Sequence, residues 1–216
     1  FMPVATQGSV KALDPDDLQR MSAALILGNT YHLYLRPGVD VVRRFGGLHG
    51  FMCWEGPILT DSGGFQGYSL KHLRKFTEDA IVFKSHIDGS THTFTPEVVV
   101  EHQQELGADF IMPLDICLSP TDGHNSLEAA VAQTSCWAER SKVAHTREDQ
   151  FLFGIVQGGL VPELRGRAAE EITSIGFPGY AIGGLSVGES KSDMYDVTRL
   201  TTGLLPSGSP RYLMGV

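Results

Sequence analysis

The sequence is poor in cysteine and has no long apolar run. Its 216 residues include three cysteines, and no two of them form a CxxC pair. An odd number of cysteines without paired spacing argues against a disulfide framework. No stretch of about 18 or more apolar residues occurs, so no membrane span is expected, and no signal-peptide pattern opens the chain. We therefore expect a reduced, cytoplasmic protein without membrane contact.

Positive charge is also scarce. There are 17 Lys and Arg residues against 25 Asp and Glu residues, which gives a formal net charge of -8. A self-sufficient nucleic-acid binder usually has a basic surface instead. Either the partner is not a nucleic acid, or the basic surface is local or lies outside this chain. The one basic run, Lys71–Lys75, is interpreted as a solvated loop or helix face.

Signatures of common metal and nucleotide sites are missing. The 8 histidines are scattered without HxxxH or the Cys/His spacing of zinc sites. The glycines of Ser62–Gly64 form neither GxGxxG nor a Walker A loop, and no GxSxG elbow is present. No metal site is predicted within these residues, and binding of nucleotide phosphates has little support.

Short apolar runs alternate with helix-length amphipathic segments. Near-continuous apolarity is typical of strands that are buried on both faces. The predicted strands span residues 1–5, 24–28, 57–60, 108–114, 151–156, 180–184 and 211–216. A β-hairpin is predicted where residues 81–84 and 92–94 flank Asp88–Gly89.

Helices are predicted between the strands. Asp14 and Thr95 each place a capping side chain before a proline at the first helical position. Gly107 should end the second of these helices. The longer predicted helices span residues 96–106, 126–145 and 162–175.

Seven buried strands that alternate with helices predict a parallel α/β fold. A doubly wound sheet and a (β/α)8 barrel both fit this pattern. The barrel usually needs about 250 residues, so seven strands in 216 residues would form a barrel without its eighth strand. The chain begins and ends within apolar runs, Phe1–Ala5 and Tyr212–Val216, so we expect it to be a fragment.

Polar or glycine-rich residues follow most of the predicted strands. In barrels these strand ends face one mouth, where catalytic groups gather. A carboxylate at Asp61 or Asp115 accepts two donors side by side, such as N1–H and N2–H₂ of guanine. Gln157 and the backbone N–H of Gly184 can donate to O6 of that base, and Phe65 offers a flat face for stacking. Each residue alone is commonly a turn or capping residue, so the prediction depends on the set.

Two motifs at these strand ends are specific. Residues 60–66 read Thr-Asp-Ser-Gly-Gly-Phe-Gln, and residues 210–216 read Pro-Arg-Tyr-Leu-Met-Gly-Val. With these motifs, the sequence resembles the tRNA-guanine transglycosylase family, also called queuine tRNA-ribosyltransferase, of the bacterial-like catalytic-subunit type. The resemblance covers essentially the whole chain, and its further matches lie at residues 1–4, 28–33, 36–38, 106–109, 154–158 and 181–189.

The resemblance implies a fold and a reaction. It implies that residues 1–216 form a partial (β/α)8 TIM-barrel domain, without the eighth strand and the zinc-binding subdomain. It also implies base exchange at the wobble guanosine of tRNAs with GUN anticodons, on the route to queuosine. In the family, a nucleophilic aspartate forms a covalent tRNA–enzyme intermediate. Relatives from bacteria further imply a homodimer.

The resemblance also assigns roles at the strand ends. Asp61 falls on the family's proton acceptor. The other predicted substrate-binding residues are Asn29 near the ribose, Ser62, Gly63, Gly64 and Phe65 in the substrate-binding loop, Asp115, Gln157 and Gly184 against the base, Leu185 with its backbone carbonyl toward the 7-substituent, and Met214 beside the base. Two carboxylates in one partly desolvated pocket should titrate together, with one pKa raised.

Two residues bear on the choice of incoming base. Val187 stands where the queuine-using eukaryotic enzymes of the family tend to carry glycine, and Cys117 follows Asp115 by two positions, as in many bacterial enzymes. A bulkier pair leaves less room for the cyclopentenediol of queuine. The sequence therefore favours 7-aminomethyl-7-deazaguanine (preQ1) as the incoming base.

The family's nucleophilic aspartate and its CxCxxC…H zinc site would lie beyond Val216. The chain alone is therefore expected to bind no zinc and to be inactive. Alternatives are a non-catalytic tRNA-binding partner subunit, an archaeal type that inserts a nitrile-bearing base, and a small-molecule barrel enzyme outside the family. The intact motif around Asp61 favours the enzyme over the partner subunit, because such subunits tend to lose those residues.

Overall fold

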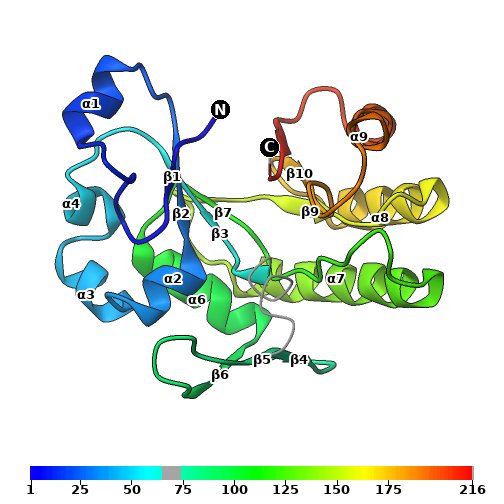
Figure 1. Ribbon diagram of the computed structural model, residues 1–216, viewed down its shortest axis with the longest axis horizontal. Coiled ribbons are helices and arrows are strands. Elements are labelled where there is room, and N and C mark those ends of the chain that lie inside the picture. The colour runs from blue at the N-terminus through cyan, green and yellow to red at the C-terminus, as the bar shows by residue number, and fades with distance from the viewer. Residues whose placement is uncertain (65–73, 216) are drawn as a thin grey trace.

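Parallel strands form the centre of the fold, and helices pack outside them (Figure 1). The computed structural model describes residues 1–64 and 74–215. The first parallel sheet has the order β1-β2-β3-β7-β8, and the second has the order β9-β10-β11. These strands are β1 (Val4–Ala5), β2 (Ile26–Asn29), β3 (Ile58–Asp61), β7 (Phe110–Ile111), β8 (Phe151–Leu152), β9 (Gly154–Val156), β10 (Tyr180–Ile182) and β11 (Arg211–Leu213).

One extended segment joins the two sheets. Its first part, β8, pairs with β7, and its second part, β9, pairs with β10. Between them, the backbone N–H of Phe153 donates to the carbonyl of Ile111 at 3.1 Å. The described parallel strands therefore neighbour one another in chain order, without the reversal that defines a doubly wound sheet. The prediction of a parallel α/β fold is confirmed, with strands shorter than expected.

The two sheets share one apolar core on the face away from the helices. Alternate strand residues point to the same side, and this side carries Leu59, Met112, Phe153, Ile155 and Ala181 as one buried cluster. The intervening positions, such as Ile58 and Ile182, belong to a larger cluster beneath the helices. Side chains from both sheets meet in the first cluster, so the sheets curve toward each other.

Several helices begin and end where the sequence predicted. In α6 (Pro96–Leu106), the Thr95 side chain accepts from the N–H of Val98, and Gly107 ends the helix in the left-handed conformation. The helix α8 (Pro162–Ile175) has the predicted bounds, and α7 (His124–Ala144) begins two residues before the predicted start. In α1 (Pro15–Arg20), Asp14 and Asp17 form a capping box. Figure 1 shows α7 and α8 side by side.

Other elements were not predicted. They are α2 (Thr30–Leu35), α3 (Val39–Arg44), α4 (Leu48–Met52), α9 (Lys191–Leu204) and β4 (Arg74–Phe76). The predicted hairpin is confirmed as β5 (Ile81–Lys84) and β6 (Thr91–Phe94), and β4 adds a third antiparallel strand.

The basic run Lys71–Lys75 was expected in a loop or on a helix face. That prediction is wrong for Arg74 and Lys75, which lie in β4 and pair with Phe83 and Val82 of β5. The rest of the run, residues 71–73, lies outside the described residues. None of the helices in the described ranges is long and apolar enough to cross a membrane.

Candidate active site

Asp61 is the last residue of β3 and lies beside Asn29, the last residue of β2. The Asn29 side chain caps α2, because its Oδ1 accepts from the N–H of His32 at 3.0 Å. Its Nδ2 donates to Oδ2 of Asp61 at 2.7 Å. The backbone N–H groups of Thr30 and Gly63 donate to Oδ1 of Asp61 at 3.1 and 3.2 Å. Asn29, which was predicted near a ribose, therefore contacts and orients the Asp61 carboxylate.

Asp115 follows β7 and accepts hydrogen bonds from two of the predicted residues, Ser62 and Gln157. The Ser62 hydroxyl donates to its Oδ1 at 3.2 Å, and Nε2 of Gln157 donates to its Oδ2 at 2.7 Å. The backbone N–H of Gly64 in turn donates to the Ser62 hydroxyl at 3.1 Å. Ser62, Asp115 and Gln157 are all buried. The ends of β3, β7 and β9 therefore bring this part of the predicted set together.

Burial raises the pKa of both carboxyl groups. The pKa of Asp61 rises to about 7, because burial outweighs the hydrogen bonds from Thr30, Gly63 and Asn29, and the charge of Asp115 raises it further. The pKa of Asp115 rises to about 6, because burial outweighs the hydrogen bonds from Gln157 and Ser62. Both groups therefore exchange protons near neutral pH, a property common in active sites.

The segment after β10 lies against the Gln157 side chain. A Cβ built on Gly183 would lie 2.7 Å from Nε2 of Gln157, and one built on Gly184 would lie 2.4 Å from its Oε1. A side chain at either position would therefore displace the Gln157 amide. The next residue, Leu185, is buried, and the Glu189 carboxylate accepts from the backbone N–H groups that follow it. Glu189 was within a quoted motif, but no role was predicted for it.

The end of β11 closes the same region. The backbone N–H of Met214 donates to the carbonyl of Ile182 at 3.2 Å, and its side chain packs on the apolar cluster shared by the two sheets. Tyr212 from the same strand was not predicted. Burial, followed by the negative charge of Asp61, raises the pKa of Tyr212 to about 12. The phenol therefore lies within electrostatic range of the carboxylate, although β11 and β3 are in different sheets.

The two predicted specificity residues, Cys117 and Val187, are buried, with 5% and 8% of their surfaces exposed. The electrostatic influence of Cys117 raises the pKa of the Arg165 guanidinium, against the larger lowering by burial. The backbone N–H of Val187 donates to Glu189 at 3.0 Å. Phe65, predicted to stack on the base, lies outside the described residues.

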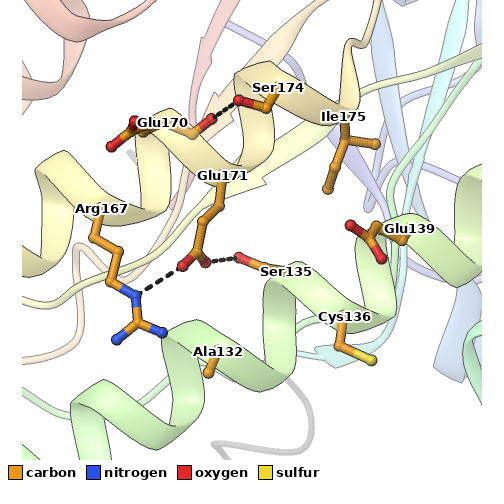
Figure 2. A pocket seen from close by; sticks show the side chains of 9 residues that line it. All are labelled: Ala132, Ser135, Cys136, Glu139, Arg167, Glu170, Glu171, Ser174 and Ile175. Atoms are coloured by element: carbon orange, nitrogen blue, oxygen red, sulfur yellow. Dashed lines mark hydrogen bonds and ion pairs between the residues drawn. The ribbon is translucent and has the colours of Figure 1, made fainter.

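Two surface grooves lie apart from these residues. Figure 2 shows the groove between α7 and α8, where Arg167 pairs with Glu171 at 2.7 Å and Ser135 donates to the same carboxylate. The other groove lies between α2, α3 and the hairpin. None of the predicted site residues lines either groove. Among residues 1–64 and 74–215, no three His, Cys, Asp or Glu side chains gather in a way that would hold a metal ion.

The buried Asp115 should make the free energy of unfolding depend on pH. Its pKa is 3.8 in an exposed chain and about 6 in the fold, so the folded protein keeps a proton that the unfolded chain releases between these values. The contribution of Asp115 to the free energy of unfolding therefore falls as the pH rises from about 4 to about 6, and it is constant above that range. Urea denaturation of the full-length protein and its Asp115→Asn variant measures this contribution.

As the pH rises from about 4 to about 6, the free energy of unfolding of the variant should increase relative to that of the wild type. Asp61 titrates in both proteins, and only the part of its pKa shift that the charge of Asp115 causes differs between them. A difference that does not change with pH would show that the pKa of Asp115 is not raised by the fold.

The comparisons with known proteins agree with the motifs. The sequence model of the queuine tRNA-ribosyltransferase family matches residues 1–216. Proteins named queuine tRNA-ribosyltransferase are 56% identical in Solidesulfovibrio magneticus, 55% in Desulforamulus reducens and 56% in Caldanaerobacter subterraneus subsp. tengcongensis. Each alignment covers 100% of this chain and 58% of the relative, so the chain spans little more than half the length of these relatives. This chain belongs to the queuine tRNA-ribosyltransferase family.

Proposed function

We propose that the protein containing this chain replaces the wobble guanine of tRNAs with GUN anticodons by a 7-deazaguanine, on the route to queuosine. The observation that carries the proposal is the hydrogen-bonded set of Ser62, Asp115 and Gln157 beside the Asp61 carboxylate. The names of the relatives specify a ribosyltransferase that acts on tRNA with queuine. The set supplies the groups that a guanine edge requires.

Asp115 and Gln157 retain unused hydrogen-bonding capacity. An ionised carboxylate offers about four acceptor sites, and Ser62 and Gln157 use one each on Asp115. Its remaining sites can accept N1–H and N2–H₂ of guanine. The amide of Gln157 has a second N–H besides the one that it donates to Asp115, and this N–H can donate to O6. The backbone of Gly184 and Leu185 lies against the same amide.

Asp61 supplies proton transfer. Three donors hold its carboxylate in one orientation and leave part of its acceptor capacity free. A base is most effective when its pKa is near the working pH, and the pKa of Asp61 is about 7. We assign Asp61 as the acceptor of the proton that the incoming base loses. Met214 flanks the base, and Leu185 presents its carbonyl to the 7-substituent.

We assign residues 1–216 to seven strands of a (β/α)8 barrel, in which β8 and β9 form one strand. The support is the chain-ordered parallel strands and the apolar cluster that both sheets share. The nucleophilic aspartate of the covalent intermediate, the zinc ligands and most contacts with tRNA are assigned to residues outside this chain. A cytoplasmic homodimer that uses preQ1 rather than queuine completes the proposal, with buried Cys117 and Val187 limiting the room for the 7-substituent.

The test is incorporation of tritiated guanine into tRNA by the full-length, zinc-loaded protein. Incorporation is expected with a GUN anticodon and not with the same tRNA carrying adenine at the wobble position. Competition by preQ1 should exceed competition by queuine, and equal competition would contradict the assignment of Cys117 and Val187. A folded protein that binds this tRNA but incorporates no guanine would instead be a non-catalytic partner subunit.

A further inference from the structure

We propose that Arg165 is a positioning residue of the base site, whose buried guanidinium fixes the strand end carrying Gln157 against the segment carrying Gly184 and Leu185. The proposal rests on the proposed function, because it assigns Arg165 a part in binding the exchanged base. Arg165 lies on α8, outside the set of residues predicted from the sequence.

The guanidinium reaches both sides of the site through backbone carbonyls. Arg165 has 0% of its surface exposed. Its Nε donates to the carbonyl of Gly159 at 2.8 Å, and its Nη1 donates to the carbonyl of Val156 at 2.9 Å. These two carbonyls bracket Gln157 in the chain. Its Nη2 lies 3.5 Å from the carbonyl of Gly184, a longer contact that spans to the segment after β10.

A glycine lets α8 come close enough for these bonds. A Cβ built on Gly158 would lie 2.8 Å from the backbone nitrogen of Arg165 and 3.0 Å from the carbonyl carbon of Leu164. Gly158 also has a φ of +130°, which side chains rarely allow. The turn after β9 therefore rests directly on the backbone of α8. The first glycine of the Gly-Gly pair after Gln157 is therefore required for this close packing.

Arg165 forms no ion pair with any carboxylate in the described part of the chain. Burial lowers the pKa of its guanidinium to about 10, so the group is charged at neutral pH. Burying a charge is costly, and apolar side chains often replace buried ionic groups without loss of stability. If the side chain at position 165 only filled space in the core, an apolar residue would therefore be favoured. The planar guanidinium fork instead points its N–H groups at three backbone carbonyls, so it can hold two backbone segments together.

The positions of these carbonyls link Arg165 to base binding. Val156 immediately precedes Gln157, so the hydrogen bond to its carbonyl fixes the backbone from which the Gln157 side chain extends. The contact with Gly184 restrains the peptide that joins Gly184 to Leu185. The charge of Glu189, which accepts from the N–H groups of the same segment, also raises the pKa of Arg165. Loss of the fork should therefore change the spacing between the amide of Gln157 and this segment.

The experiment compares the Arg165→Lys variant of the full-length protein with the wild type. Lysine keeps the charge but lacks the planar fork, so it cannot bond to the three carbonyls in the same way. The KM for guanine should rise about tenfold, because displacement of the Gln157 amide weakens its hydrogen bond to the base. The kcat should change less than about twofold, because the displaced amide weakens binding of the base equally in the ground state and in the transition state. Affinity for tRNA, measured by filter binding, should also be unchanged, since phosphate contacts dominate it.

Arg167→Met is the matched control. Arg167 lies two residues further along α8, where Figure 2 shows its pair with Glu171. It also pairs with Glu128 at 3.1 Å. Its replacement should leave the KM for guanine unchanged. Arg165→Met is a second variant, which removes the donors to all three carbonyls and should raise this KM further. Thermal melting shows whether that variant remains folded.

The outcomes separate this inference from the proposed function. A wild-type protein that does not exchange guanine refutes the proposed function. An active wild type with an unchanged KM for guanine in folded Arg165→Lys refutes only the positioning role. If kcat falls while this KM stays constant, Arg165 maintains the amount of folded enzyme and does not position the base site.

Discussion

The Asp61→Asn variant is expected to lose guanine exchange by about 10²- to 10⁴-fold in kcat, the usual contribution of a general base. An amide does not accept the proton that the incoming base must lose. The surroundings also oppose the amide. If its NH₂ group replaces Oδ2, it faces the donating Nδ2 of Asn29, and if it replaces Oδ1, it faces the N–H groups of Thr30 and Gly63. All three neighbours are donors, so they suit a carboxylate.

The measurement is incorporation of tritiated guanine by full-length wild type and variant across pH 6 to 9. Because Asp61 must be ionised to accept a proton, the wild-type rate should rise as the pH passes through about 7. Asp196→Asn is the control, since Asp196 is exposed on α9 and pairs only with Arg199 in the described part of the chain. Activity of the Asp61 variant above about a tenth of wild type would remove Asp61 from the role of proton acceptor.

Much of the arrangement of the candidate site could be predicted, because parallel strands place their carboxyl ends on one side of a sheet. Asp61, Asp115 and Gln157 each follow an apolar run, so their convergence follows from the strand pattern alone. The boundaries of α6 and α8 were also predictable, since Pro96 and Pro162 begin them and Gly107 and Gly176 follow them. Local rules are sufficient where a cap or a breaker stands at the end of an element.

The remaining elements depend on contacts between distant segments. The helices α2, α3 and α4 have five or six residues, too few to show a helical period. Tyr212 belongs to one of the two specific motifs, but its electrostatic interaction with Asp61 arises only when the two sheets curve toward each other. The burial of Arg165 could have been predicted from the helical period. It lies three and four residues before the buried Ala168 and Ala169, which places a charged residue on the buried face of α8.

The Gly64→Ala variant is expected to lower kcat/KM for guanine by about 10²-fold, because misplacement of a binding group by about 1 Å can have an effect of this size. A Cβ on Gly64 would lie 2.3 Å from Oδ1 of Asp115 and 2.7 Å from its backbone oxygen. The side chain alone cannot relieve both contacts. Either Asp115 or the backbone at residue 64 must therefore move, which changes the hydrogen bonds that join Gly64, Ser62 and Asp115.

Gly166→Ala provides the matched control, because it adds the same methyl group where nothing lies within 4 Å. Gly166 is within α8, so alanine there should stabilise the fold by up to about 1 kcal/mol and leave exchange unchanged. Steady-state kinetics with tritiated guanine and thermal melting of both variants separate a local effect from unfolding. Gly64→Ala should remain folded with a much higher KM for guanine. Wild-type kinetics in this folded variant would mean that binding of the base does not depend on the position of Asp115, and the base would then require another acceptor.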